Sequence, residues 1–403
     1  MLSLTRNKHS CFNANQYKMK PGENSRFFVF SERMYSLSYR LRAVVSCMLA
    51  VSLCGVSLGL RGQRDADIAA AVYHAEDAFR YSGFSREAYP ALIGPFLRNG
   101  KYKPFTSVAF PAFPIPALGE GYVPQGMCYS QALGWFALAY YHPEKRPGLL
   151  ALVDAQSGEF VKAVYLLKPG GVPYTGHAGG AAAWGEHLWI TSESRAWRLA
   201  AQDLREAQNG GTVRFRDTFR SASRGGIAFV AQGMLWLGDS YAHERSRPLP
   251  EDRLDPESGN RAWCVGYPLR EDSPTGVAGY PAAVLCIQDS AQGACEAGDG
   301  AFVISVSFTA SAPSWLWIYP SLRGILEQPP DREVAVENRS CPLWVVDPVM
   351  ARARQMLAPM SEGICEYDGK VYTWYESAAL LYRSRAEMYA DYVFALEITP
   401  ARP

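Results

Sequence analysis

The sequence predicts an all-β fold, a β-propeller with five located repeats and therefore five or six blades, preceded by an N-terminal membrane or signal helix. A pattern of two short apolar strands around a turn recurs five times after residue 120, where no helical period of comparable strength appears. Glycine (35 residues) and proline (27 residues) supply many turns in the 403-residue chain. Repetition of one unit favours a propeller over the alternative, a β-sandwich, which does not need similar four-stranded units.

Each repeat begins at a glycine and ends in polar residues that follow its second strand. The first reads PQGMCYSQALGWFALAYYH from Pro124, and the fifth reads SEGICEYDGKVYTWYESA from Ser361. Third strands are readable near residues 149, 195, 262, 314 and 391. A sixth blade could form from the lead-in near Phe105 and the C-terminal strand; more simply, one terminus completes a fifth blade and closes the ring. The anchoring glycines are Gly126, Gly180, Gly226, Gly293 and Gly363.

Residues 43–60 form an uncharged apolar stretch, AVVSCMLAVSLCGVSLGL, with arginines on both sides. This pattern is typical of a signal sequence or a short membrane anchor, whereas a buried core helix would need a polar face. We therefore expect the protein in the cell envelope, outside the cytoplasm: anchored in the inner membrane or, if the segment is processed, secreted or a lipoprotein. Cleavage, lipidation at Cys47 or Cys54, and a true start at Met1 or Met34 stay open.

The chain divides into four parts. Residues 1–42 are an N-terminal tail or extended n-region, and residues 43–60 are the signal or anchor segment. Residues 61–120 contain an expected helix at 65–81 and a proline-rich lead-in with a strand at 106–110, and residues 121–403 form the propeller. The net charge is +1 and the basic residues are scattered, so no nucleic-acid partner is expected; the expected contact with a membrane is through residues 43–60.

Four short segments, at residues 124–126, 176–180, 361–363 and 375–377, resemble β-propellers of the NHL-repeat and gluconolactonase-like kind, above all poorly characterised bacterial secreted ones. The resemblance extends over about residues 121–398 and implies the fold, without a substrate. Metal-dependent lactonases of that class place a Glu, an Asn and an Asp around a metal on the channel axis. Glu362 and Asp239 match the first and last, but no Asn does, so lactonase activity does not follow.

Six cysteines lie beyond the apolar segment, and three of them occupy one position of the repeat. Cys128, Cys295 and Cys365 each follow an anchoring glycine by two residues, where the other repeats have alanine. We expect these three to be buried free thiols near the axis. Cys264 and Cys286 are the best candidates for a disulfide, since both could lie on adjacent strands of the third blade. No spacing indicates a zinc site.

Propeller topology brings the start of each inner strand and the end of each second strand to one face, the channel mouth. Polar residues gather at both places, so this mouth is the candidate ligand site. Glu362, Asp239 and His177 are the candidate metal ligands, suited to calcium or another divalent ion, and the histidine could act as a general base. The alternative is that these polar residues only tie neighbouring blades together. The candidate ligand-binding residues are Gln125, His177, Glu193, Asp239, Gln292, Ser307, Glu362 and Glu376.

These features predict a membrane-anchored or exported binding module for an unidentified ligand or protein partner. The alternative function is a metal-dependent hydrolase of the lactonase or esterase type, with its site at the channel mouth. It requires Glu362, Asp239 and His177 to converge on one ion. A structural scaffold of the envelope is a third interpretation. Whether the protein is an enzyme, and whether it holds a cofactor, stays open at the level of sequence.

Overall fold

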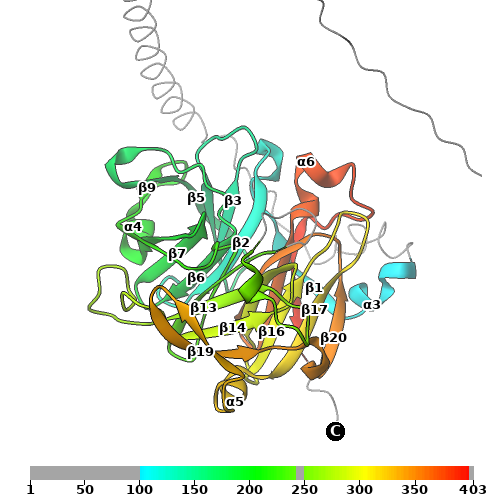
Figure 1. Ribbon diagram of the computed structural model, residues 1–403. Coiled ribbons are helices and arrows are strands. Elements are labelled where there is room, and N and C mark those ends of the chain that lie inside the picture. Colours follow the sequence, from blue (N-terminus) through cyan, green and yellow to red (C-terminus); the bar gives the residue numbers. More distant parts are fainter. Residues whose placement is uncertain (1–99, 242–248, 399–403) are drawn as a thin grey trace, which may run out of the picture. The chain divides into compact units, whose positions relative to one another are not determined.

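The computed structural model describes residues 100–241 and 249–398, and the segments predicted at 43–60 and 65–81 lie outside these residues. Five β-sheets stand around one axis as five blades (Figure 1). Their inner strands contact each other in a closed circle, in the order β2, β6, β11, β15, β21. The all-β propeller is confirmed, with five blades rather than six. The inner strands are β2 (Val123–Ser130), β6 (Gly180–Trp184), β11 (Ile227–Ala231), β15 (Ala291–Glu296) and β21 (Ser361–Tyr367).

In each blade the first four strands, counted outward from the axis, are antiparallel, while the fifth strand of blades 1 and 3 is parallel to its neighbour; the predicted third strands are all present. Blade 1 is β2, β3 (Trp135–Tyr141), β4 (Leu149–Asp154), β5 (Phe160–Leu167) and β9 (Thr212–Arg214); blade 2 is β6, β7 (His187–Ser192), β8 (Arg195–Ala200) and β10 (Asp217–Arg220). Blade 3 is β11, β12 (Met234–Gly238), β13 (Ala262–Pro268), β14 (Ala283–Ile287), β19 (Arg339–Val345) and β18 (Arg332–Val336). Blade 4 is β15, β16 (Ala301–Val306), β17 (Ser314–Ser321) and β20 (Ala353–Leu357); blade 5 is β21, β22 (Lys370–Tyr375), β23 (Tyr392–Glu397) and β1 (Ala109–Pro114).

The helices of the described residues are short and lie between strands. None of them is long and apolar enough to cross a membrane. They are η3 (Gly100–Tyr102), α3 (Lys103–Thr106), η4 (Leu118–Glu120), η5 (Pro169–Gly171), α4 (Ala201–Glu206), η6 (Glu251–Arg253), α5 (Leu322–Leu326), η7 (Pro348–Met350), η8 (Glu376–Ala378) and α6 (Leu380–Arg383).

The ring is closed by the lead-in strand, as one of the two sequence interpretations expected. Strand β1 pairs antiparallel with β23 and completes blade 5, with Ala109 opposite Leu396 and Pro114 opposite Tyr392. The strand predicted at 106–110 was placed too early, because residues 103–106 form α3. Pro104 lies in the first turn of this helix, where its fixed φ is favourable and its missing N–H costs no hydrogen bond.

Two neighbouring blade pairs are also joined by exchanged strands. Strand β9 comes from the connection between β8 and β10 of blade 2, yet it pairs with β5 of blade 1. The hairpin β18–β19 comes from the connection between β17 and β20 of blade 4, and β19 pairs with β14 of blade 3. In Figure 1 this orange hairpin lies along the yellow-green strands of blade 3. These strand pairings add backbone hydrogen bonds between neighbouring blades.

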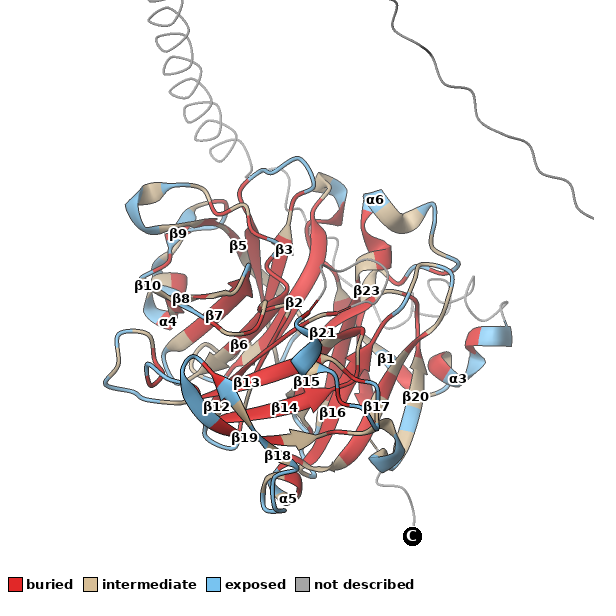
Figure 2. Ribbon diagram, viewed as in Figure 1, coloured by how far each residue is buried: buried red, intermediate tan, exposed pale blue. Residues whose placement is uncertain are grey.

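Tryptophans on the second strands form part of the core between blades. Trp189, Trp236 and Trp374 are fully buried, which agrees with the predicted packing role and leaves no face for carbohydrate stacking. Figure 2 shows the strands mostly buried, with exposure concentrated in the connections. The second strands therefore supply large apolar side chains, while the inner strands supply small ones.

The anchoring glycines allow the inner strands to approach each other around the axis. A Cβ atom on Gly126 would lie 2.5 Å from the carbonyl carbon of Gly180. A Cβ atom on Gly363 would lie 2.5 Å from the amide nitrogen of Met127. Backbone atoms of a packed sheet cannot move aside as a flexible side chain can, so these positions require glycine. This close approach explains the glycine at the start of four repeats, whereas a Cβ atom on Gly226 would meet Ser240 of its own blade.

The substitution Gly126→Ala is expected to lower the free energy of unfolding by about 2 kcal/mol, because the added methyl group would overlap the backbone of the next blade. Urea unfolding followed by tryptophan fluorescence measures this loss. Gly279→Ala is the matched control, since a Cβ atom there would meet no atom within 4 Å. Equal stability of the two variants would contradict the close-approach argument.

The structure corrects the predicted disulfide. Cys264 lies on β13 and Cys286 on the adjacent β14, but Cys264 is paired with Leu285 and Cys286 with Trp263. Because residues one position out of register point to opposite faces of a sheet, the two sulfur atoms face different cores. All six cysteines of the described residues are buried free thiols.

Candidate functional site

Three inner strands carry a bulge at the channel mouth, and each bulge includes a predicted site residue. The register shifts lie between Pro124 and Met127 in β2, between Ala291 and Gly293 in β15, and between Ser361 and Ile364 in β21. The residues before the anchoring glycines are here Gln125, Gln292 and Glu362. A bulge redirects a side chain away from the regular alternation of the strand. Blades 4, 5 and 1 are consecutive around the ring, so these three residues follow one side of the mouth.

Glu362 is buried without a partner. Its side chain is only 6% exposed, and its carboxyl oxygens, which are not fully enclosed, make no hydrogen bond or ion pair with any residue that the structure describes. Burial raises the pKa of Glu362 well above its usual range, and the charge of Glu376 raises it further. The two glutamates therefore form a pair that retains a proton near neutral pH.

Glu376 follows β22, at the first position of η8, and is held by polar neighbours from blades 1 and 5. Gln125 donates from Nε2 to Glu376 Oε1 at 3.2 Å, and the Tyr141 hydroxyl donates to the same oxygen at 3.4 Å. The hydroxyls of Tyr141 and Tyr382 lie 3.2 Å apart. Burial raises the pKa of Glu376 to about 7, although the hydrogen bonds oppose the shift. We call Glu362, Glu376, Gln125, Tyr141 and Tyr382 the mouth cluster.

The indole of Trp374 holds the backbone of Gln125, on the blade 1 side of the cluster. Trp374 donates from Nε1 to the backbone oxygen of Gln125 at 3.0 Å, across the boundary between blades 5 and 1. Gln125 Nε2 also donates to the oxygen of Pro124 at 2.7 Å. Burial, followed by the charge of Glu376, raises the pKa of Tyr141, so this hydroxyl keeps its proton and acts as a donor.

His177 extends the cluster towards blade 2. Its ring packs on Tyr141, with centroids 4.5 Å apart, and its other side is exposed. Desolvation by the surrounding mouth residues, together with the charge of Lys145, lowers the pKa of His177, while Glu193 opposes this effect. Glu193 is exposed in the turn between β7 and β8, with a φ of 54°. The structure thus brings His177 and Glu193 near each other beside the mouth cluster.

Asp239 is used differently from the prediction. Arg253 donates from a guanidinium nitrogen to Asp239 Oδ2 at 2.6 Å, and the backbone N–H of Arg224 donates to Oδ1 at 2.7 Å. The guanidinium group of Arg253 also packs on the Trp263 ring, 4.8 Å from its centroid. This carboxylate is fully buried and is occupied by an ion pair within blade 3.

The predicted metal set is therefore not assembled. Within residues 100–241 and 249–398, no three His, Cys, Asp or Glu side chains are grouped so that they could hold a metal ion. Glu362 is beside Glu376, His177 is against Tyr141, and Asp239 is committed to Arg253. Neither the calcium nor the transition-metal interpretation has a ready ligand set in this arrangement.

Gln292 and Ser307 contact neighbouring residues instead of the mouth cluster. Ser240 donates to Gln292 Oε1 at 2.6 Å, which joins blades 3 and 4. Ser314 donates to the Ser307 hydroxyl at 3.1 Å and accepts a hydrogen bond from the backbone of Ser361 at 3.1 Å. These two predicted residues support the alternative in which polar mouth residues tie blades together.

The sequence interpretation missed two residues that decide the roles of their partners. Tyr382 lies on α6 and Arg253 on η6, and both elements belong to long connections outside the repeat pattern. The repeats gave no equivalent position from which to infer them. The one available signal was the charge-rich and aromatic composition of these connections.

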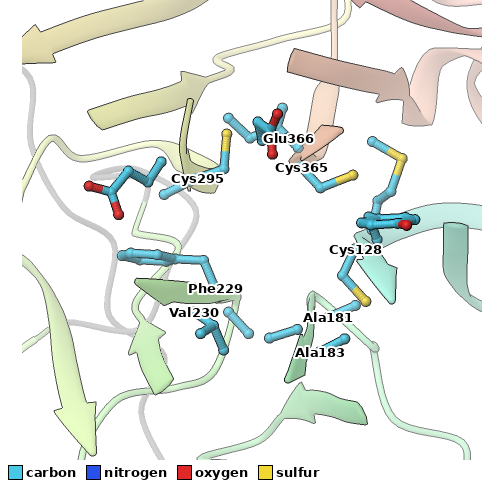
Figure 3. A pocket seen from close by; sticks show the side chains of 15 residues that line it. Cys128, Ala181, Ala183, Phe229, Val230, Cys295, Cys365 and Glu366 are labelled. Carbon is cyan, nitrogen blue, oxygen red and sulfur yellow. The ribbon is translucent and has the colours of Figure 1, made fainter. Parts of the chain in front are cut away.

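The inner strands line a second space, further along the channel beyond the glycines. Residues that follow the glycines line a cavity of about 150 Å³, with three thiols around its centre (Figure 3). Burial raises the pKa of Cys128 to about 12 and raises those of Cys295 and Cys365 as well. The thiols are thus protonated and packed, as predicted, and Ala182 and Ala228 line the same cavity.

The likeness of this chain to known proteins is found in structure and not in sequence. No family model and no curated protein matches the sequence. Similar solved structures include a glutaminyl cyclase from Myxococcus xanthus, 13% identical over 65% of this chain and 88% of that one (TM-score 0.36). A gluconolactonase from Xanthomonas campestris is 11% identical over 73% of this chain and 80% of that one (TM-score 0.31). A luciferin-regenerating enzyme is 10% identical over 68% of this chain and 91% of that one (TM-score 0.34). Neither an activity nor a ligand for this chain follows from these likenesses; the five-bladed propeller itself is what the structure establishes.

Proposed function

We propose that this chain is a ligand-binding β-propeller, exported or held at a membrane through residues 43–60, which binds a small polar ligand at the mouth between blades 5 and 1. The observation that supports it is Glu362, a buried carboxyl group with no partner among the described residues. Buried polar groups in proteins are nearly always paired, because an unpaired one loses its bonds to water without replacement. A ligand that reaches the mouth would supply the missing partner.

The surroundings of Glu362 fit a binding role. Tyr141, Tyr382 and Gln125 come from two blades and carry both donors and acceptors. Small-molecule sites typically consist of a few convergent polar groups on a rigid scaffold. The hydrolase alternative has less support, since Asp239 is held by Arg253. A protein partner instead of a small ligand would have to place one polar group in the same mouth.

Ligand-detected NMR on the full-length protein in detergent tests this proposal. A set of small polar fragments of positive, negative and zero charge is expected to include binders that are lost in Glu362→Gln and in Tyr141→Phe. Glu159→Gln is the control, because Glu159 is exposed in the connection between β4 and β5, at the opposite face. Absence of any binder, or binders unaffected by both mouth variants, would contradict the proposal. Stoichiometric calcium or zinc that is lost in Glu362→Gln would favour the hydrolase instead.

A further inference from the structure

We propose that the mouth cluster binds an organic cation, an ammonium or guanidinium group that enters between Glu362 and Glu376. This inference rests on the proposed function and specifies its ligand class. It follows from how the chain treats its buried carboxylates, from the donors and acceptors of the mouth, and from the aromatic rings at its rim.

The chain supplies a cation to each of its other buried carboxylates. Three carboxylate side chains are buried among the described residues: Asp239, Asp255 and Glu362. Asp239 is paired with Arg253 at 2.6 Å, and Asp255 is paired with Arg332 at 3.0 Å. Within residues 100–241 and 249–398, the charge that acts on Glu362 is that of another carboxyl group, Glu376, and no lysine or arginine is paired with it. Because a buried carboxylate is costly without a counter-charge, the ligand is expected to bring one.

The mouth offers hydrogen-bond acceptors in the number that an ammonium group needs. An ammonium group donates three hydrogen bonds, and a guanidinium group donates five in one plane. The carboxyl oxygens of Glu362 and Glu376 and the hydroxyl oxygen of Tyr382 can accept them. A calcium ion would need six to eight oxygen ligands, and no group of three carboxylates or histidines is present in the described residues. The donor and acceptor set thus fits an organic cation better than a metal ion.

Aromatic rings complete the site. The rings of Tyr141 and His177 pack together with their centroids 4.5 Å apart, and the hydroxyl oxygens of Tyr382 and Tyr141 lie 3.2 Å apart. Tyrosine faces attract cations through the ring quadrupole, more strongly when water is excluded. His177 does not compete for the carboxylates with a charge of its own, because desolvation lowers its pKa. The rings of Tyr141 and His177 therefore lie beside the two carboxyl groups without adding a positive charge of their own.

Binding of a cation should be coupled to proton release. The free pair retains a proton because burial disfavours the ionised form of both carboxyl groups, and the charge of Glu376 further disfavours that of Glu362. A cation between them favours both ionised forms and expels that proton, so affinity rises with pH while the amine itself stays protonated. A neutral ligand of the same shape would show no such dependence.

The test uses the full-length protein in detergent and four probes of one size: n-butylammonium, n-butylguanidinium, n-butanol and butyrate. NMR titrations at pH 6 and pH 8 are expected to show binding of the two cations, with a Kd at least fivefold lower at pH 8. We expect butanol and butyrate to bind at least tenfold more weakly. A pH indicator in weakly buffered solution should record proton release with the cations. The relative affinities of the two cations distinguish an amine from a guanidine ligand.

The variants separate this inference from the proposed function. Glu362→Gln is expected to weaken butylammonium at least tenfold at pH 8 and to abolish the pH dependence, while Glu159→Gln leaves both unchanged. Glu362→Gln keeps the size of the side chain, and thermal unfolding checks that it is folded. If neutral or anionic fragments bind in a Glu362-dependent way and the cations do not, the organic-cation inference is overturned and the binding function stands. If no fragment of any charge binds at the mouth, both are overturned.

Discussion

Asp239→Ala is expected to lower the free energy of unfolding by about 3 to 5 kcal/mol, the typical cost of removing one partner from a buried ion pair. The change leaves Arg253 as an unpaired guanidinium group that is only 14% exposed. It also removes the acceptor for the backbone N–H of Arg224. Denaturant unfolding at pH 7, followed by circular dichroism, measures the loss.

Two further variants establish the cause of that loss. Adding Arg253→Met to Asp239→Ala should restore part of the stability, because the uncompensated charge is then gone. Asp272→Ala is the surface control, since Asp272 and its partner Arg270 are both exposed, and we expect no measurable change. A stable Asp239→Ala protein would mean that the carboxylate is not tied to Arg253 and is free for a ligand.

Glu362→Gln is expected to do the opposite and to stabilise the protein at pH 8. The pKa of Glu362 is raised in the folded protein, so the folded state holds a proton that the unfolded chain releases above about pH 4.5. Stability therefore falls as the pH rises above about 4.5, and it continues to fall until the pH passes the raised pKa of Glu362 in the folded protein. Glutamine has no charge to bury and also removes the repulsion of Glu376.

Melting temperatures between pH 4 and pH 9 check this expectation. Wild-type protein should lose stability through this window relative to Glu362→Gln, and the two should converge near pH 4.5, where both side chains are uncharged. The exposed substitution Glu159→Gln should run parallel to wild type. If Glu362→Gln were destabilised at pH 8, the carboxylate would have a favourable partner and the argument for an external cation would fail.

The repeated fold was predictable from the sequence because it has a local cause. A Cβ atom on Gly126 or Gly363 would overlap the next blade, and a Cβ atom would also meet an atom within 3 Å at the other anchoring glycines, so glycine recurs at this position of every repeat. Cys128, Cys295 and Cys365 are visible for the same reason, since small side chains are needed around one cavity. The number of blades was less certain, because closure depends on pairing between β1 and β23, strands from opposite ends of the propeller.

The site was predicted only in part. Glu362, Glu376 and Gln125 could be located because strand starts and strand ends must share a face, but their roles depend on side chains from the connections. The ion pair of Asp239 with Arg253 arises in such a connection and carries no repeat signature. The disulfide prediction failed for a finer reason: adjacent strands are visible in sequence, whereas a register shift of one residue between Cys264 and Cys286 is not.

The pairing of β1 with β23, which closes the ring, also determines how the propeller would respond to a pulling force. The two strands are antiparallel, with Ala109 beside Leu396, so the chain enters and leaves blade 5 at the same edge. Pulling those ends apart would load the backbone hydrogen bonds one pair after another, as in a zipper, rather than all together in shear. A force that pulled both ends would therefore open the propeller most easily where these two strands pair.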